Sequence, residues 1–349
     1  MSEVEFQIID PRADHAGLQA ARGLLADCQL APDDDVEVFV AAWLDGQLAA
    51  CAGLAGSVIK CVAIAPALRG EALSLTLVNE AVQLAAERGH FQLFLYTRPE
   101  SAAFFAGCGF YPLAEAPGLA VLMENSPVAI SRYCSRLRML RQPSNRTGCV
   151  VMNANPFTRG HRYLAEQAAA DCDWLHVFVV REDVSAFPYA ERFELVRQGL
   201  AGIPNLTLHH GSEYMISRAT FPCYFLKEKG LAAHCHTAID LLLFRERIAP
   251  ALGISHRYVG TEPFCPVTNK YNKDMRHWLQ QAASEAPPVA VVEMPRARQG
   301  GRAVSASEVR RLLARRDFLA IEPLVPASTL RHLLTAYAED PHPDPERYG

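Results

Sequence analysis

The chain has 349 residues, of which 50% are hydrophobic and 21% are charged, so its composition is that of a folded protein rather than a disordered one. This length is enough for two domains of ordinary size with large buried cores. The formal net charge of −4 argues against a broad nucleic-acid-binding surface, because such a surface needs a basic footprint.

The sequence predicts neither a membrane-spanning segment nor a signal peptide. No long uncharged apolar run occurs, and the first residues, MSEVEFQIID, carry acids where a signal peptide would carry lysines. We therefore expect a soluble, cytoplasmic protein that acts on neither membranes nor nucleic acids.

The ten cysteines are scattered along the chain without any C-x-x-C pair. Several lie in apolar runs, where a reduced thiol behaves as a small hydrophobic side chain. One local cluster, His234-Cys235-His236, has the side chains of a metal site, but no second cluster stands at metal-binding spacing. Reduced thiols and no protein-bound metal are the expectation.

Residues 1–125 have the pattern of an α/β domain. Two apolar runs on either side of Asp45-Gly46 predict a β-hairpin. A short strand, the turn Arg69-Gly70 and a long helix follow, and then a strand over 91–97 and a small helix. This order of elements and the sequence segments RGEAL and FFAGCGFYPL resemble the fold of the GNAT acetyltransferases.

The GNAT resemblance implies that the turn before the long helix holds the pyrophosphate of coenzyme A. Arg69, Gly70 and Ala72 would then bind a CoA-like arm. Ala67 stands where the family pattern has a polar or basic residue. The alternative is an α/β domain with a purely structural role.

Residues 126–147 read as a linker, made of a short basic helix and then a loop around Pro143-Ser144-Asn145. Its arginines are interpreted as a solvated face, because the run is short and carries a single aromatic residue.

Residues 148–349 read as a second domain, in which apolar strands alternate with helices. Strands are expected at 149–152, 174–180, 206–210, 256–259 and 289–293, and helices at 161–170, 189–200, 236–249 and 270–283. Continuous apolar strands separated by helices predict a Rossmann-like parallel sheet with helices on both faces. The whole chain is therefore placed in the α/β class. Such sheets bind ligands beyond the carboxyl ends of their strands.

The turn at the end of the first of these strands predicts an anion site. Thr158-Arg159-Gly160-His161 opens a helix, whose first N–H groups lack partners and lie at the positive end of the helix dipole. Gly160 leaves room for close approach, and His161 adds a side-chain donor. The alternative is that Thr158 is an ordinary helix N-cap and His161 a partly exposed first-turn residue.

A second helix start near the C-terminus has similar properties. Ser305 and Glu308 have the spacing of a capping box, in which Glu308 reaches back to free N–H groups. Arg310 follows in the helix, where a cation is more favourable if an anion lies between it and the helix start. The alternative is a capped helix with a solvated basic face. No residue at either helix start is a candidate for a covalent nucleophile.

The two helix starts resemble the paired signatures of the nucleotidyltransferase superfamily, [HT]-x-G-H and I-S-[ST]-x-x-x-[RK]. Val304 replaces isoleucine here, and one small residue is inserted between Ser305 and Ser307. The resemblance implies that ATP binds between the helices with its Mg²⁺ ion, which is held mostly by phosphates and water.

Four longer sequence segments resemble one family within this superfamily, the citrate lyase ligases. They are MNANPFTRGHRYLAEQAA, VVREDVSAFPYAERFELV, VGTEPFCPVTNKYNKDM and VSASEVRRLL, and they cover essentially the whole chain. That family converts acetate and ATP to acetyl-adenylate and passes the acetyl group to the prosthetic-group thiol of the citrate lyase acyl carrier subunit.

Carried over, this resemblance implies site residues in four segments of the second domain. Thr158 and His161 would hold the phosphates with Asn155, Gly160 and the Phe157 backbone, and Ser305, Ser307 and Arg310 would close the opposite side. Gly260, Thr261 and Glu262 are candidates for the nucleotide or the acyl group, and Arg181, Glu182 and Asp183 have similar weight.

Two other functions stay open. One is adenylyl transfer to a phosphorylated small molecule such as nicotinamide mononucleotide or phosphopantetheine. Val184 stands where the phosphopantetheine enzymes often carry lysine, which weakens that substrate. The other is a non-catalytic protein that senses nucleotide or acetyl-CoA.

Overall fold

The structure is a computed structural model that describes residues 4–68, 71–181, 185–215, 225, 229–262 and 266–337. The chain divides into two compact units. The first comprises Met1–Ile130 and Thr220–Ile239, and the second comprises Ser131–Ala219 and Asp240–Gly349. The stretch expected as a linker holds the arginine-rich helix α4 (Ala129–Arg138).

The first unit is built on a seven-stranded sheet with the order β1-β2-β3-β4-β5-β7-β6. Its elements are β1 (Glu5–Ile9), α1 (His15–Asp27), β2 (Val38–Leu44), β3 (Gln47–Ala55), β4 (Val58–Ile64), α2 (Glu71–Glu87), β5 (Phe94–Thr97), α3 (Ala102–Gly107), β6 (Tyr111–Ala116) and β7 (Ala120–Glu124). The expected hairpin is confirmed: β2 and β3 pair antiparallel, and Asp45 and Gly46 both have positive φ, as a tight two-residue turn requires.

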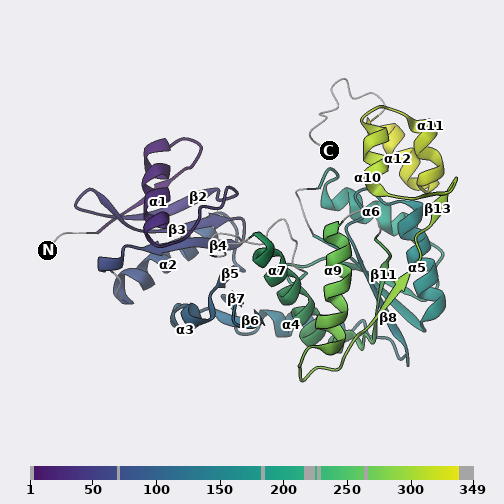
Figure 1. Cartoon of the computed structure of the whole chain (residues 1–349), viewed down its shortest axis with the longest axis horizontal. Helices are drawn as coiled ribbons and strands as arrows, with labels where there is room; N and C mark the ends of the chain where they lie inside the picture. The colour runs from purple at the N-terminus through teal and green to yellow at the C-terminus, as the bar shows by residue number, and fades with distance from the viewer. Residues whose placement is uncertain are drawn as a thin grey trace. The chain divides into compact units, whose positions relative to one another are not determined.

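Helices cover both faces of this sheet, with α1 and α2 on opposite sides (Figure 1). The apolar stripe of α2 has the helical spacing expected from the sequence, and Leu77, Val78, Ala81 and Ala85 are fully buried against the strands. Strands β4 and β5 run parallel and pair at Val58↔Phe94 and Ile59↔Leu95, whereas the rest of each strand continues without this pairing. The sheet therefore opens between them.

The second unit contains a five-stranded sheet with the order β10-β9-β8-β11-β12, in which every pair is parallel. Its elements after α4 are β8 (Thr147–Met152), α5 (Arg159–Asp171), β9 (Trp174–Val179), α6 (Tyr189–Gly199), β10 (Leu206–His210), the end of α7 (Lys229–Leu243), α8 (Ala249–Leu252), β11 (His256–Gly260), α9 (Pro266–Arg276), β12 (Ala290–Met294), β13 (Arg298–Gln299), β14 (Arg302–Ala303), α10 (Ala306–Leu313), α11 (Phe318–Ile321) and α12 (Ala327–Tyr337). The predicted α/β class and parallel sheet are confirmed.

Two predicted helices differ from the observed ones. The helix expected at 236–249 is α7 followed by a π-helical turn over Phe244–Ile248 and then α8. The helix expected at 270–283 begins earlier, at Pro266, and also ends in a π-helical turn, over His277–Gln281. Apolar periodicity does not distinguish a continuous α-helix from one that widens at its end, because the buried face is nearly the same.

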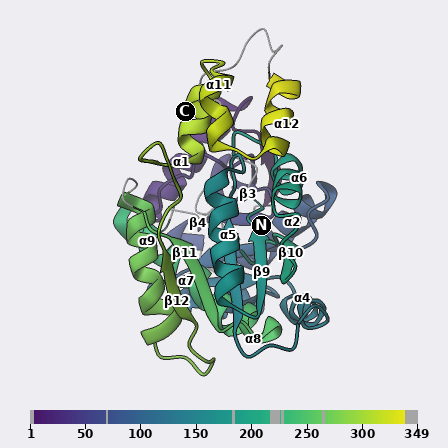
Figure 2. The same ribbon diagram turned by 90° about the vertical axis from the view of Figure 1, so that its right-hand side faces the viewer.

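One face of the parallel sheet packs on α5 and α6, and Figure 2 shows α5 in front of the strands. The helix approaches closely because its buried residues are small: Ala165, Ala168 and Ala169. The other face is partly polar. His176 on β9 and His209 on β10 are buried and hydrogen-bonded to each other at 2.8 Å, and Arg257 on β11 lies over the Phe244 ring.

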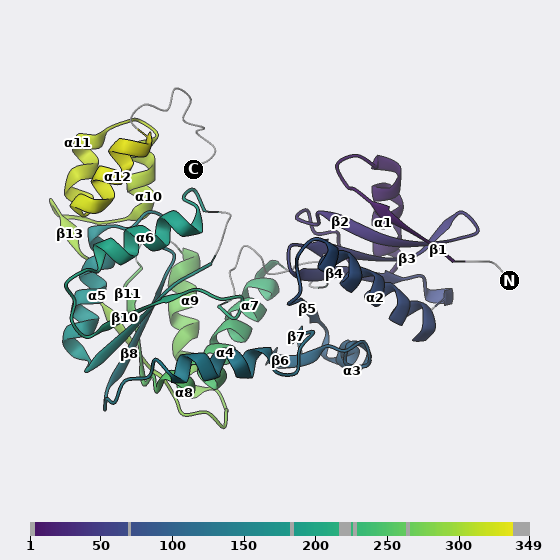
Figure 3. The same ribbon diagram turned by 180° about the vertical axis from the view of Figure 1, so that it is seen from behind.

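Helices α10, α11 and α12 form a small bundle at the C-terminal end of the described chain (Figure 3). They pack around the fully buried Phe187. Glu191 on α6 fixes α12, because it pairs with His332 at 2.6 Å and accepts a hydrogen bond from Tyr337. Among the residues that the structure describes, no helix is long and apolar enough to span a membrane.

Candidate functional site

Thr158 begins α5 in the way that the strand–turn–helix pattern predicts. Its hydroxyl accepts a hydrogen bond from the His161 N–H, and the His161 side chain accepts one in return from the Thr158 N–H, at 3.0 Å. This is a capping box in which a histidine takes the place of the usual glutamate or glutamine. Thr158 is 1% exposed, so its side chain serves the helix cap.

The capping box also fixes the protonation of His161. A backbone N–H can only donate, so Nδ1 of His161 is the acceptor and carries no proton. Burial, with a further contribution from the Arg296 guanidinium, lowers the pKa of His161 to about 4. The imidazole is therefore neutral at pH 7, with its proton on Nε2 as a hydrogen-bond donor.

The turn between β8 and α5 is held by backbone and side-chain contacts. Ala154 has φ +51°, a left-handed conformation that is uncommon outside glycine and that often occurs at functional sites. The Asn155 side chain accepts a hydrogen bond from the Phe187 N–H at 3.1 Å. Phe157 is fully buried, and its ring stacks on His161 with centroids 5.6 Å apart. Phe157 thus packs against one face of the His161 imidazole.

The start of α10 confirms one half of the expected capping box and corrects the other. The Ser305 hydroxyl accepts from the Glu308 N–H, as an N-cap does. Glu308 does not reach back to the helix start; both of its carboxylate oxygens accept from Arg311 instead. A guanidinium one turn away offers two charge-assisted bonds, which outweigh a single bond to a backbone N–H. Ser307 is exposed and accepts from Arg310.

The two helix starts converge. Arg310 on α10 donates to the Asn155 carbonyl oxygen at 2.7 Å, which ties α10 to the turn before α5. A Cβ atom on Gly160 would lie 3.4 Å from the Val304 carbonyl oxygen, so the backbones of the two segments are in contact there. Burial lowers the pKa of Arg310 from its usual value, yet the group stays cationic. We call this region the α5–α10 site.

A third predicted segment lies at the carboxyl end of β11, the strand next to β8. The Thr261 carbonyl oxygen accepts from Nε of Arg296 at 2.6 Å, and the Glu262 carboxylate forms a short ion pair with the same guanidinium. Gly260 lies beside Arg296, and its carbonyl oxygen accepts from Asn272. The structure thus places Gly260, Thr261 and Glu262 around Arg296, a residue that sequence reasoning did not single out.

Arg192 is a second residue that the sequence reasoning missed. It is fully buried on α6 and donates to the carbonyl oxygens of Asn153, Val180 and Phe187 at 2.7–3.0 Å. One guanidinium therefore holds the ends of β8 and β9 and the segment before α6 together. Because Phe187 also donates to Asn155, this network continues to Arg310.

Several predicted residues fall elsewhere. Arg69, Gly70, Glu182, Asp183 and Val184 lie outside the described residues. Ala72 is exposed near the start of α2, and Arg181 is exposed and pairs with Glu213 at 3.5 Å.

The described cysteines are free thiols, and Cys235 is buried on α7. Within the described ranges, no group of three or more His, Cys, Asp or Glu side chains is arranged to hold a metal ion.

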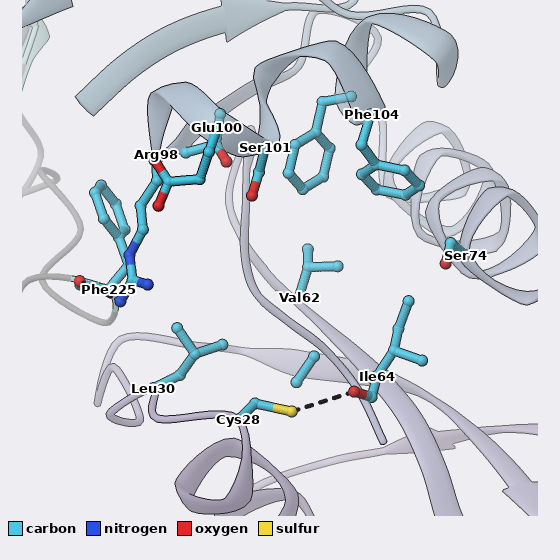
Figure 4. A pocket seen from close by; sticks show the side chains of 13 residues that line it. Cys28, Leu30, Val62, Ile64, Ser74, Arg98, Glu100, Ser101, Phe104 and Phe225 are labelled. Carbon is cyan, nitrogen blue, oxygen red and sulfur yellow. Dashed lines mark hydrogen bonds between the residues drawn. The ribbon is translucent and has the colours of Figure 1, made fainter. Parts of the chain in front are cut away.

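The first unit contains a cavity of about 550 Å³ where β4 and β5 part (Figure 4). We call it the N-terminal pocket. Its lining is mostly apolar and includes several polar side chains: Cys28, Leu30, Val62, Ala63, Ile64, Ser74, Thr97, Arg98, Glu100, Ser101, Phe104, Phe105 and Phe225. Arg98 donates to the Phe225 carbonyl oxygen, and the Cys28 thiol donates to the carbonyl oxygen of Ile64 at 3.2 Å.

The N-terminal unit resembles solved acetyltransferase structures. ElaA from Escherichia coli is 20% identical, with a TM-score of 0.32, and the match covers 36% of this chain and all of that one. An acyl-CoA N-acyltransferase from Pseudomonas aeruginosa is 22% identical, with the same TM-score and coverage.

Most of the chain is similar in sequence to known proteins. The model of the citrate lyase ligase C-terminal domain matches residues 147–333. The [citrate [pro-3S]-lyase] ligase of Escherichia coli K12 is 54% identical over 92% of both chains. That of Klebsiella pneumoniae is 52% identical over 93% of this chain and 94% of its own. The chain therefore belongs to the citrate lyase ligase family of enzymes.

Proposed function

We propose that this protein activates citrate lyase by acetylating the prosthetic-group thiol of the lyase's acyl carrier subunit, with acetate and ATP as substrates and acetyl-adenylate as the intermediate. Its family supports action on citrate lyase. The observation that carries the chemistry is the convergence of α5 and α10, joined by the bond from Arg310 to Asn155.

The α5–α10 site suits the phosphates of ATP. The starts of α5 and α10 direct N–H groups and the positive ends of two dipoles toward the same region, and Arg310 adds a full positive charge there. His161 would donate from Nε2 to a phosphate oxygen, and Ser307 would add an exposed hydroxyl. Donors and cations suit phosphate oxygens but not a metal ion. We therefore expect Mg²⁺ to arrive with the triphosphate, held by phosphates and water, and to neutralise its charge.

The first step needs orientation and charge stabilisation rather than a protein nucleophile. An acetate oxygen attacks the α-phosphorus and forms a new P–O bond, while the bond from that phosphorus to the bridging oxygen breaks and pyrophosphate leaves. Negative charge develops on the departing pyrophosphate. Arg310, the helix N–H groups and the Nε2–H of His161 are arranged to stabilise that charge.

The second step transfers the acetyl group to a thiol. The sulfur attacks the carbonyl carbon of acetyl-adenylate, the bond to AMP breaks, and the thiol proton passes to solvent. We propose that the N-terminal pocket binds part of the CoA-like arm that carries this thiol, and that Arg69, Gly70 and Ala72 hold its phosphates. The volume of the pocket and its apolar lining with a few polar groups fit an extended, uncharged arm segment.

Acetate-dependent exchange between ATP and labelled pyrophosphate tests the first step. We expect exchange with acetate, less with propionate or citrate, and none without a carboxylic acid. Exchange that needs nicotinamide mononucleotide or phosphopantetheine instead would identify an adenylyltransferase. Tight binding of nucleotide without any exchange would identify a sensor protein and refute the ligase mechanism.

A further inference from the structure

Helix α4 and the turn that follows it form a basic surface. Residues 125–145 contain no aspartate or glutamate, although the chain as a whole has a net charge of −4. The structure shows that the arginines of this stretch are all exposed: Arg132, Arg136, Arg138 and Arg141. Within the described ranges, none of them forms an ion pair, and Arg138 donates to Ser135 of the same helix. Their charges are therefore open to a partner.

The opposite side of α4 is packed on the second unit. Cys134 and Leu137 are buried, and the Cys134 thiol donates to the Arg247 carbonyl oxygen at 3.4 Å, just before α8. Figure 3 shows α4 beside α8. Arg132 and Arg136 lie one turn apart on the side that faces away from this contact. The helix is thus held in place while its arginines stay exposed.

Helix stability does not explain all of these charges. Arg136 and Arg138 lie in the last turn of α4, where a cation interacts favourably with the helix dipole. Arg132 is the fourth residue of the helix, near the positive end of the dipole, where a cation is unfavourable. It also lies four residues before Arg136, and like charges at this spacing repel each other. Arg132 therefore suits an external anionic partner better than it suits the isolated helix.

Two large apolar side chains extend this basic surface. Met139 is 84% exposed and Leu140 is 46% exposed, in the turn directly after α4. Met139 follows Arg136 at helical spacing and lies on the same side. Arginine and methionine are both enriched in protein–protein interfaces. We call this region the α4 surface and define it by its exposed side chains: Arg132, Arg136, Arg138, Met139, Leu140 and Arg141.

The α4 surface suits an acidic protein better than a nucleic acid or a membrane. Tyr133, the single aromatic residue of α4, is half-buried and packs on Tyr214 with ring centroids 5.2 Å apart, so it offers no platform for stacking a base. A helix that binds a membrane surface turns its apolar face outward. In α4 the apolar side chains Cys134 and Leu137 are buried instead.

We propose that the α4 surface docks an acidic surface of citrate lyase. This inference rests on the proposed function, which makes citrate lyase the partner. Within the second unit, α4 and α10 lie at different ends (Figure 3). A lyase molecule docked on α4 would therefore leave the α5–α10 site open to ATP, and docking and adenylation would depend on different residues.

The test is binding of the full-length protein to the intact, deacetylated citrate lyase complex, measured by biolayer interferometry. Wild-type binding is predicted to weaken between low salt and about 0.3 M NaCl, because salt screens exposed charges. Arg132→Glu combined with Arg136→Glu is predicted to weaken binding, and to raise the KM for the lyase in acetyl transfer, by about tenfold or more. Acetate-dependent exchange should stay unchanged, which would also show that the variant is folded.

Two further variants separate specific docking from a general effect of charge. Arg22→Glu combined with Arg331→Glu makes the same change in net charge at exposed positions on α1 and α12, and it is predicted to leave binding unchanged. Met139→Ser is predicted to weaken lyase binding roughly fivefold through loss of apolar contact, without any change in net charge.

Equal loss of binding in the two charge-reversal variants, or unchanged binding in either Arg132→Glu/Arg136→Glu or Met139→Ser, would overturn the proposal. So would wild-type binding to duplex DNA or to phosphatidylglycerol vesicles as tight as binding to the lyase. Binding needs no catalysis, so its outcome is distinguishable from a failure of the exchange assay, which would refute the proposed chemistry instead.

Discussion

The α5–α10 site and the N-terminal pocket differ in the chemical groups that form them. The first is made of backbone N–H groups, capped helix starts and arginines linked by hydrogen bonds, with Arg310 and Arg192 connecting separate segments. The second is a mostly apolar cavity where two strands of a sheet part. In the proposed function, this contrast corresponds to two separate tasks: stabilising a polyanion during bond cleavage, and accommodating a long uncharged segment.

The largest expected effect is at His161. Replacing His161 by Ala removes the Nε2–H donor and half of the capping box of α5, and we expect acetate-dependent exchange to fall by about 10²-fold or more. Circular dichroism of the variant would show whether the fold is retained. Exchange within a few-fold of wild type would exclude His161 from the mechanism. It would also contradict the role of the α5–α10 site in stabilising the phosphates.

Arg310 should come next. Arg310→Lys keeps the charge but loses the planar fork that joins Asn155 and Ser307, so we expect exchange to fall by roughly 10- to 100-fold. The matched control is Arg311→Lys. Arg311 is adjacent, exposed and paired only locally with Glu308 on its own helix, so its replacement should change exchange by less than about twofold. Equal effects of the two variants would contradict the bridging role of Arg310.

A smaller and more selective effect is expected in the N-terminal pocket. Ser101 lines it and makes no capping hydrogen bond to α3, so Ser101→Trp should fill the cavity without loss of a cap. We expect transfer to the carrier thiol to fall about tenfold while exchange stays unchanged, since an ordered apolar arm segment contributes one to a few kcal/mol of binding.

The matched control is Ala103→Trp, at an exposed position on the same helix outside the pocket. It should leave both reactions unchanged. If Ser101→Trp reduces exchange as much as transfer, the two regions do not divide the reaction as proposed.

The smallest effect concerns stability, and it follows from the buried histidine pair. Burial lowers the pKa of His176 to about 4 and, with the neighbouring His176, that of His209 to about 3. The unfolded chain binds protons at these residues near pH 6.5, whereas the folded chain does not. Folding is therefore destabilised as the pH falls below about 6.5, by up to a few kcal/mol near pH 4.

Calorimetric unfolding of the full chain between pH 8 and pH 4 measures this loss. His176→Phe with His209→Leu should flatten the pH dependence, whereas replacing the exposed His15 by Gln should not. An unchanged slope in the double variant would show that other groups cause the acid sensitivity.

The sequence predicts the features that depend on local pattern. The hairpin at Asp45-Gly46, the stripe of α2 and the start of α5 at Thr158 follow from turn chemistry, helical spacing and N-cap preference. Side-chain size also matters in α5: Tyr163 and Leu164 are half-buried, whereas the small Ala165, Ala168 and Ala169 carry the contact with the sheet. Close helix–sheet packing favours small residues, which hydrophobic scales rank low.

Contacts between distant segments could not be predicted. Arg296 meets Thr261 and Arg310 meets Asn155 only because parallel strands bring their carboxyl ends together. An isolated arginine in a loop has no periodicity to distinguish it from a solvated one. The N-terminal pocket was missed for a related reason, since apolar residues that line a cavity have the same pattern as those that fill a core.

In the proposed mechanism, the starts of α5 and α10 together hold the phosphates of ATP. A crystal structure of the protein with a non-hydrolysable ATP analogue and Mg²⁺ tests it most directly. We expect phosphate oxygens within hydrogen-bonding distance of Nε2 of His161 and of the Arg310 guanidinium. Phosphates bound elsewhere, with His161 and Arg310 facing only solvent or protein, would contradict it.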